Sequence, residues 1–541
     1  MNPDGLSYLD LASDASTGGP LKLVNAYWSP GYPALISIAI FLFRPSPDQE
    51  FAVIHFVNLL IFIFALWSFS FFMRNWFQTI ERERGVNESW KYYFTPFAFC
   101  TFLWFTLQYI GTEGVTPDLA VAAMVFLAAG LTCRVSLPES DWKDYVALGL
   151  VLGLGYYVKA AMFPLGLILL VLLFLLLPLS GDLVRRKLLA SLSLSLLVFL
   201  LVAAPLVTAL SVRAHSLTIG EAGRLNYAWF VDGLRWADNV EHPRPYETPN
   251  HPAPKLDTEP LTLVFASPIG GTYPLWYDPS YWYAGVKVQF DLRRQITTLE
   301  QSFQDCKEAV IDSMAFIAGA LVLFVLGLGS KAPLMLPRRS WWQLAWPLAA
   351  WAMYALVHVE SRFLGAFLVL LWLATYGAVM FRVDRRIAIA ITATVLATVL
   401  VPFTATMAWE SARSAKELVH PKVPDYQIAA LALRQLGLQS GDRLAVVGYG
   451  FDSYYARYDR LRIVAQIPDP TEFWHLSTPE LKSLEERLAS VGVKAVVAQN
   501  RPDAGPTAAW KDVKLSDSVL SVLLLSPEVA DVSPHSGLGY Q

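Results

Sequence analysis

Long apolar segments separated by short polar loops cover residues 52–409 of this 541-residue chain. A helix needs about 20 mostly apolar residues to cross the roughly 30 Å hydrocarbon core of a bilayer. The pattern predicts ten membrane-spanning helices. They lie at 52–74, 93–111, 118–133, 144–158, 160–178, 188–210, 308–329, 341–358, 362–381 and 386–409.

A shorter apolar segment, residues 31–43, precedes the first of these spans. Pro30 and Pro33 open it, and the sequence R-P-S-P follows it. About 13 residues are too few to cross a bilayer, so we expect an interfacial or re-entrant helix.

Lys and Arg residues are concentrated in every second loop, and the positive-inside rule makes those loops cytoplasmic. We therefore predict a multi-pass protein of the cytoplasmic (inner) membrane, with its active site and C-terminal domain on the extracytoplasmic side. The basic residues are Arg74, Arg82, Arg84 and Lys91; Arg134 and Lys143; Arg185, Arg186 and Lys187; Lys331, Arg338 and Arg339; Arg382, Arg385 and Arg386.

After Glu410 the composition becomes that of a soluble domain. Short apolar runs alternate with helical patterns, which predicts a small α/β domain with a largely parallel sheet. Its G-Y-G-F-D-S sequence lacks the third glycine of a dinucleotide-binding fingerprint. The expected strands are 443–448, 461–466, 493–498 and 519–525, and the expected helices are 425–437 and 478–490.

Three regions follow from these patterns. Residues 1–51 form an outer loop with the interfacial helix, and residues 52–409 form the membrane domain, with a long outer loop at 211–307. Residues 410–541 form the extracytoplasmic α/β domain. The fold class is thus a mainly α polytopic membrane protein with a small C-terminal α/β domain.

Composition agrees with a membrane protein, since 55% of residues are hydrophobic and only 16% are charged. The net charge of −3 gives no reason to expect nucleic acid as a partner. Cys100, Cys133 and Cys306 are too scattered for a disulfide framework or a metal-binding motif.

Ionisable residues gather on the predicted extracytoplasmic side. Such residues are costly at membrane depth, so they usually face a cavity or a partner. A cationic pair, Lys159 and Arg362, facing an acidic loop would suit a lipid phosphate and a carboxylate base. The alternatives are that Lys159 extends to the interface and that Arg362 pairs with Glu360. The acidic candidates are Asp4, Asp10 and Asp14 in the first loop, and Glu113 and Asp118 in the next turn.

Loop 211–307 is too long for a simple connection, so we expect it to be functional. Its segment 270–283 is rich in Tyr and Trp, residues that anchor proteins at membrane interfaces. We expect Tyr8, Trp276 and Tyr277 to contact the substrate, with interface anchoring as a compatible alternative.

No metal site is certain from the sequence. The carboxylates lack the His or Cys spacing that selects a transition metal. Two alternatives remain open: the protein uses no cofactor, or carboxylate oxygens bind Mg²⁺ or Mn²⁺.

The first-loop sequences P-D-G-L-S-Y-L-D-L-A and Y-W-S-P-G-Y-P resemble the first outer loop of GT-C class glycosyltransferases. The similar bacterial members are the dolichyl-phosphate-mannose mannosyltransferase-like and RgtA/B/C/D-like proteins. The resemblance covers residues 3–381. It is also carried by V-T-P-D-L-A-V-A-A (115–123), V-K-A-A-M-F-P-L (158–165), V-E-S-R-F (359–363) and G-G-T-Y-P-L-W-Y-D-P-S-Y-W (270–282).

The resemblance implies transfer of a sugar from a polyprenyl-phosphate carrier to a glycan, lipid or protein acceptor at the outer face, with inversion. It implies that Asp4 is the first-loop base and that Asp118, or else Glu113, is the second acid. It also implies that Lys159 and Arg362 contact the lipid phosphate. Because the family has a helix before this Asp, we also expect a membrane helix upstream of Met1.

A second hypothesis is a non-enzymatic polyprenyl-lipid transporter or binding protein. A transporter predicts inverted repeats and helices broken near the membrane midplane. The sequence shows no internal repeat, and the acids lie at the rim of the bundle, so we favour the enzyme.

Overall fold

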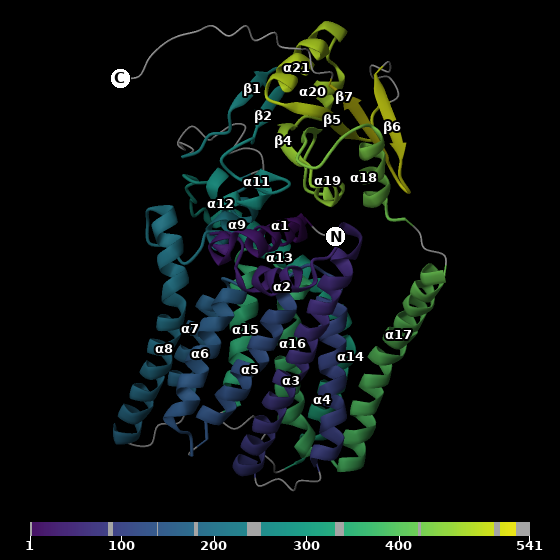
Figure 1. The fold of residues 1–541 in the computed structure, drawn as a ribbon. Helices are drawn as coiled ribbons and strands as arrows, with labels where there is room; N and C mark the ends of the chain where they lie inside the picture. The colour runs from purple at the N-terminus through teal and green to yellow at the C-terminus, as the bar shows by residue number, and fades with distance from the viewer. Residues whose placement is uncertain are drawn as a thin grey trace. The chain divides into compact units, whose positions relative to one another are not determined.

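The computed structural model describes residues 3–84, 90–137, 139–177, 182–234, 250–330, 340–419, 423–502 and 509–525. The basic loop with Lys331, Arg338 and Arg339 lies outside them. The chain divides into two compact units (Figure 1). The helical unit comprises residues 11–236 and 285–421, and the sheet unit comprises residues 1–10, 237–284 and 422–541.

The helical unit is a bundle of long apolar helices (Figure 1). The helices are α2 (Gly31–Phe43), α3 (Glu50–Arg84), α4 (Lys91–Phe105), α5 (Asp118–Val135), α6 (Trp142–Val158), α7 (Met162–Leu176), α8 (Asp182–Ala214), α9 (Ala222–Phe230), α13 (Leu292–Asp312), α14 (Met314–Leu326), α15 (Trp342–Ala355), α16 (Ser361–Val379) and α17 (Arg385–Val419). Nine of the predicted spans each lie largely on one helix, whereas the span predicted at 308–329 is wrong as a single helix, because it crosses the bend between α13 and α14.

Within the described residues, five helices are long and apolar enough to cross a membrane alone, and α13 with α14 would be a sixth span, bent by 67°. The predicted spans 93–111, 144–158, 160–178 and 341–358 lie on α4, α6, α7 and α15. These four helices have 14 to 17 residues and fall short of a full crossing by themselves. The chain is a multi-pass membrane protein.

Helix α5 lies at the centre of the bundle, with 83% of its apolar window buried, and 72% of the corresponding window of α16 is buried. Glycines allow close approach beside this centre. A Cβ added at Gly149 of α6 would lie 2.4 Å from the carbonyl oxygen of Ser195 on α8, and one added at Gly153 would lie 2.6 Å from Val202. Small residues four apart bring membrane helices together in this way.

Residues 3–18 form helix α1 (Pro3–Gly18), so the prediction of a polar first loop is wrong. Pro3 begins the helix, where its missing N–H costs nothing, and Asp4 complements the positive end of the helix dipole. Leu6, Leu9 and Ala12 recur at helical spacing and are buried. The three carboxylates obscured this apolar stripe in the sequence.

The sheet unit contains one seven-stranded sheet in the order β1-β2-β4-β3-β5-β7-β6. Its strands are β1 (Lys255–Thr258), β2 (Leu261–Val264), β3 (Arg443–Val447), β4 (Arg462–Ile467), β5 (Val493–Gln499), β6 (Trp510–Lys514) and β7 (Val519–Leu524). Helix α18 (Asp425–Gln435) leads from α17 into β3. Helices α19 (Tyr454–Tyr458), α20 (Pro470–Trp474) and α21 (Thr478–Ser490) connect strands of the sheet, and α11 (Pro274–Tyr277) and α12 (Pro279–Trp282) follow β2.

The prediction of a largely parallel sheet is confirmed for β4, β3 and β5 but wrong for the sheet as a whole. Among the described strands, β3 pairs in parallel with β4 and β5, and the four remaining pairings are antiparallel. The four expected strands are confirmed as β3, β4, β5 and β7. The antiparallel additions are β1 and β2 from the long loop, and the edge strand β6, whose side chains are mostly exposed.

A buried carboxylate joins three distant segments of the sheet unit. Asp10 of α1 accepts hydrogen bonds from the Thr272 backbone N–H at 2.7 Å and the Thr272 hydroxyl at 3.1 Å. Arg457 of α19 pairs with Asp10 at 2.5 Å, and both side chains are less than 10% exposed. Burial raises the pKa of Asp10, while the positive charge of Arg457 and the Thr272 hydrogen bonds act against this rise.

We expect Arg457→Ala to destabilise the sheet unit by about 3–5 kcal/mol, because it leaves the Asp10 carboxylate buried and uncompensated. Hydrogen exchange measures this at the Thr272 amide, which should exchange more than about 100-fold faster. Lys494→Ala is the matched control, because Lys494 forms a more exposed pair with Asp442. Equal exchange in both variants would contradict the assigned role of Arg457.

Candidate active site

Three charged side chains meet in the helical unit where three helices begin or end. Asp118 is the first residue of α5, Lys159 caps the C-terminus of α6, and Arg362 lies in the first turn of α16. The Lys159 Nζ lies 2.6 Å from Asp118 Oδ1, and the Arg362 Nη1 lies 3.5 Å from Asp118 Oδ2. The Asp118 side chain is only 2% exposed. We call these three residues the charged cluster.

Glu360 adds a second carboxylate beside Arg362. It accepts two hydrogen bonds from the Arg362 guanidinium, at 2.6 and 3.1 Å, and lies 3.5 Å from the His358 imidazole. Burial alone would raise the pKa of Glu360, but the hydrogen bonds and charges of His358 and Arg362 hold that pKa at about 2. Glu360 is therefore ionised at neutral pH, and Arg362 faces two carboxylates.

The ring of Phe363 covers both cations of the charged cluster. The Lys159 Nζ lies 3.7 Å from the ring centroid, and the Arg362 guanidinium carbon lies 5.3 Å from it. Tyr354 stacks on the same ring at 5.1 Å. An aromatic face stabilises a cation most strongly where water is excluded, so Phe363 both shields and orients these charges.

The sequence Y-W-S-P-G-Y-P (27–33) holds the segment that carries Lys159. The Ala160 backbone N–H donates a hydrogen bond to Ser29 Oγ at 2.9 Å. A Cβ added at Gly31 would lie 2.8 Å from the Tyr157 carbonyl oxygen and 3.0 Å from the Val158 Cα. Only a glycine lets the start of α2 approach the end of α6 so closely.

The same sequence also holds the turn that precedes Asp118. The Tyr32 hydroxyl donates to Asn58 Oδ1 at 2.9 Å, and Asn58 Nδ2 donates to the carbonyls of Thr112 and Gly114 at 2.9 and 3.0 Å. Asn58 is buried in the apolar helix α3. One short motif therefore positions both the negative and a positive member of the charged cluster.

We expect Gly31→Ala to destabilise the protein by about 1–3 kcal/mol, because the new Cβ must displace backbone of the Lys159 segment. Gly223→Ala is the control, since a Cβ at Gly223 meets no atom within 4 Å. Thermal unfolding of the purified protein in lipid nanodiscs measures both. A Gly31→Ala midpoint equal to that of Gly223→Ala would mean that the close approach is not required.

Protonation of Glu360 gives a prediction on pH. The ordinary pKa is 4.5 and the pKa in the folded protein is about 2, so ionised Glu360 stabilises the fold above about pH 4.5. This stabilisation is lost as the pH falls from 4.5 through 2. Glu360→Gln should therefore unfold at a lower temperature than the wild type at pH 7, by a gap that narrows steadily below pH 4.5.

The control for this titration is Glu410→Gln, because Glu410 forms only an exposed pair with Arg413 at 3.8 Å. We expect its unfolding midpoint to follow the wild type at every pH. If the unfolding temperatures of Glu360→Gln and the wild type differ by the same amount from pH 3 to 7, the titration of Glu360 does not stabilise the fold.

The structure brings together Asp118, Lys159 and Arg362, three of the residues that the sequence predicted as site residues. Glu113 is exposed in the turn before α5. The other four belong to the sheet unit. Asp4 lies in the first turn of α1, Tyr8 and Trp276 are buried, and Tyr277 packs against Gly271.

Asn58 and Phe363 are the residues of this site that the sequence analysis missed. Asn58 carried a usable signal, since a polar amide within an apolar span usually has a specific partner. Phe363 is the last residue of the V-E-S-R-F motif, which marked the segment but gave the phenylalanine no role.

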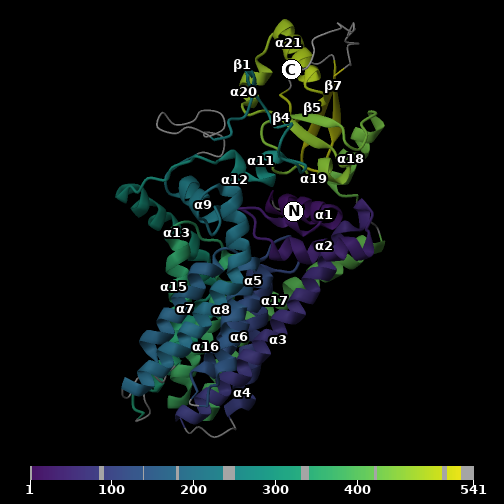
Figure 2. The ribbon, with the colours of Figure 1, turned by 60° about the vertical axis from the view of Figure 1, so that its left-hand side comes forward.

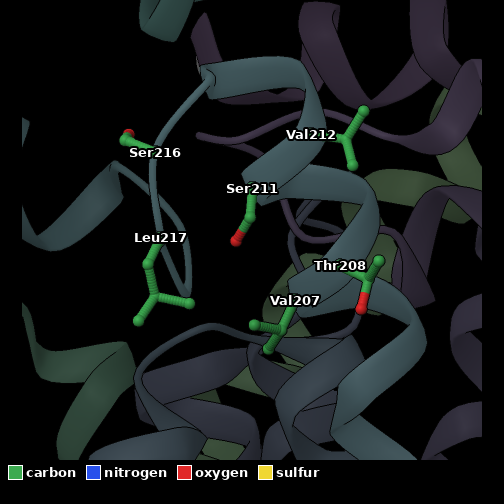
Figure 3. A pocket seen from close by; sticks show the side chains of 6 residues that line it. All are labelled: Val207, Thr208, Ser211, Val212, Ser216 and Leu217. Carbon is green, nitrogen blue, oxygen red and sulfur yellow. The ribbon is translucent and has the colours of Figure 1, made fainter.

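Neither a metal-binding group nor the cavity beside α8 adds residues to the charged cluster in the described part of the chain. Within the described ranges, no group of three or more His, Cys, Asp or Glu side chains is placed to hold a metal ion. A cavity of about 400 Å³ lies at the C-terminal end of α8 (Figure 3). None of the residues that line it belongs to the charged cluster; they are Val207, Thr208, Ser211, Val212, Ser216 and Leu217.

No family model and no curated protein matches the sequence. The structure is similar to ArnT from Cupriavidus metallidurans bound to undecaprenyl phosphate, with a TM-score of 0.51 and 12% identity over 96% of this chain and 93% of that one. It is also similar to the archaeal oligosaccharyltransferase AglB from Archaeoglobus fulgidus, with 14% identity over 92% of this chain and 65% of that one.

The likeness to AglB has a TM-score of 0.44, which is too low to support a conclusion about this chain. At 12% identity, the ArnT likeness shows the fold alone. The chain therefore has the GT-C fold that its sequence motifs resemble.

Proposed function

We propose that this chain is a membrane glycosyltransferase. It moves a hexosyl or pentosyl group from a polyprenyl-phosphate-linked donor to a glycan, lipid or protein acceptor on the extracytoplasmic side of the inner membrane. The observation that carries the proposal is the convergence of Lys159 and Arg362 on buried Asp118, where α5, α6 and α16 meet. The ArnT structure with the same fold is bound to undecaprenyl phosphate, a lipid of the proposed donor class.

Two cations at one point suit a phosphate. Arginine presents a planar fork of donors that matches phosphate oxygens, and lysine adds a mobile point charge. Lys159 and Arg362 already compensate Asp118, so phosphate binding requires that at least one of them exchanges a carboxylate partner for the phosphate. The flexible Lys159 side chain can make this exchange without moving the backbone, whereas Glu360 holds Arg362 by two hydrogen bonds.

The reaction then runs as an in-line displacement. A hydroxyl oxygen of the acceptor attacks the anomeric carbon, and the bond between that carbon and the phosphate oxygen breaks. The electron pair of that bond leaves with the polyprenyl phosphate, whose growing negative charge Lys159 and Arg362 stabilise. The hydroxyl proton passes to a carboxylate base, and the configuration at the anomeric carbon inverts.

The motif resemblance alone supports Asp4 as the base, and we assign a positioning role to Asp118. Both oxygens of Asp118 face cations, which places it well to orient Lys159 and Arg362. Its buried Oδ2 accepts no hydrogen bond among the described residues and lies 3.5 Å from Arg362 Nη1, so a small shift of the guanidinium would give it a donor. We assign no step to Mg²⁺ or Mn²⁺, because Lys159 and Arg362 beside Asp118 would repel a divalent cation there.

We expect Lys159→Ala and Arg362→Ala each to lower the rate of transfer by about 100- to 1,000-fold, as for the loss of one preorganised electrostatic group. Lys143→Ala removes an exposed lysine from the opposite end of α6 and should change nothing. A strain that lacks the protein is complemented with each variant, and its envelope glycans and glycolipids are measured by mass spectrometry.

We expect wild type and Lys143→Ala to restore one missing sugar. Lys159→Ala, Arg362→Ala and Asp4→Asn should fail to restore it. This result would establish the transferase and identify its product. Native mass spectrometry then measures the binding of undecaprenyl phosphate to the purified wild type and variants. Unchanged glycans together with retained lipid binding would refute the enzyme and favour the alternative, a non-enzymatic polyprenyl-lipid transporter or binding protein.

A further inference from the structure

Helix α13 presents three different faces. Its inner face packs against the helical unit, its outer polar face is exposed, and a third side carries exposed apolar residues. A soluble amphipathic helix has two faces, since its apolar side packs on the protein. In α13 the side that packs on the protein is mostly polar, and the apolar side is exposed.

The inner face is held by hydrogen bonds from side chains at helical spacing. Gln295 Nε2 donates to the Leu356 carbonyl at 2.8 Å, Thr298 Oγ1 to the Phe230 carbonyl at 3.2 Å, and Ser302 Oγ to the Ala355 carbonyl at 2.9 Å. These contacts fix the rotation of α13 about its own axis. The apolar side is therefore exposed as a consequence of bonds that the protein itself makes.

The exposed apolar side forms a continuous stripe, which we call the α13 stripe. Its residues recur at spacings of three, four and seven, so they share one side of the helix. Phe303 is 76% exposed, an unusual value for a phenylalanine in contact with water. The α13 stripe comprises Leu292, Ile296, Leu299, Phe303 and Val310, and it is preceded by exposed Val288 and Phe290.

The opposite side is polar and equally exposed. Arg293, Thr297, Gln301, Gln304 and Glu308 occupy it. A high hydrophobic asymmetry with charged groups on the polar side is typical of helices that lie in the plane of a membrane interface.

The bend between α13 and α14 indicates how α13 is oriented relative to the membrane plane. The axes of α13 and α14 are bent by 67° across Ser313. If the axis of α14 is parallel to the bilayer normal, the bend places α13 roughly 25° from the membrane plane. Exposed Met314 and Leu321 of α14 follow Val310, the last residue of the α13 stripe, along the chain. In Figure 2 α13 lies at the left edge of the helical unit.

We propose that the α13 stripe is a lipid-binding surface, seated at the boundary between head groups and acyl chains. A lipid occupant is favoured over a protein because the stripe leads into α14, a strongly apolar helix that itself has exposed apolar residues.

Lipid contact at this stripe supports the charged cluster. The carbonyls of Ala355 and Leu356, which Ser302 and Gln295 hold, end α15 just before the turn with His358, Glu360 and Arg362. Phe230, whose carbonyl accepts from Thr298, stacks on the His358 ring at 4.0 Å. Helix α13 is thus the brace between the membrane surface and this turn, whether or not the protein is a transferase.

The test is photo-crosslinking of the full chain in phosphatidylethanolamine and phosphatidylglycerol vesicles. The variant replaces Phe303 with p-benzoylphenylalanine, which is close to Phe in shape, and mass spectrometry measures lipid adducts. Gln301 on the polar side receives the same replacement as the matched control. Leu321, exposed on the strongly apolar helix α14, is the positive control.

We expect lipid adducts at 303 and 321, and at least tenfold fewer at 301. Adducts at 321 but not at 303 would overturn the proposal, as would equal labelling of 303 and 301. A crosslink from 303 to a second copy of the chain would replace the lipid by a subunit interface. Each variant is first compared with wild type by thermal unfolding. If the variant at position 303 is misfolded, the photo-crosslinking residue is placed at Leu299 instead.

Discussion

The helical unit depends on the neutralisation of charge at one buried point. Asp118, Lys159, Arg362 and Glu360 are brought together by helix ends that are far apart in the sequence, and two carboxylates balance two cations. An unpaired charge among apolar helices is expensive, whereas a compensated group of charges is tolerated. Helices α5, α6 and α16 must therefore keep their ends in register, and Gly31 and Asn58 help to fix that register.

The sheet unit repeats this logic with a different carboxylate. Asp10 collects donors from Thr272 and Arg457, much as Asp118 collects Lys159 and Arg362. In both units one buried acid joins segments that lie hundreds of residues apart. Losing a donor leaves the acid uncompensated, which costs more than the pair itself contributes. This asymmetry makes the cationic partners the sensitive positions.

Hydropathy was sufficient to predict the positions of the helices, and α2 agrees with its expected bounds, because apolar runs of this length have few other solutions. Lys159, Asp118 and Arg362 could be selected because charges between apolar spans are rare. The sequence could not show that α1 is helical, since its acids masked Leu6 and Leu9. It also could not show β1 and β2, whose strand character depends on pairing with β4 two hundred residues later.

The pairing of β2 with β4 has a consequence for how the protein is made. Leu263 lies opposite Gln466 in the sheet, and helices α13 to α17 come between them in the chain. A ribosome therefore completes β1 and β2 long before their partner strand exists. The sheet closes only after the last membrane helices have been inserted, which makes it a late and slow step of biogenesis. A fragment that starts at residue 410 would lack β1 and β2 and leave the edge of β4 open to aggregation.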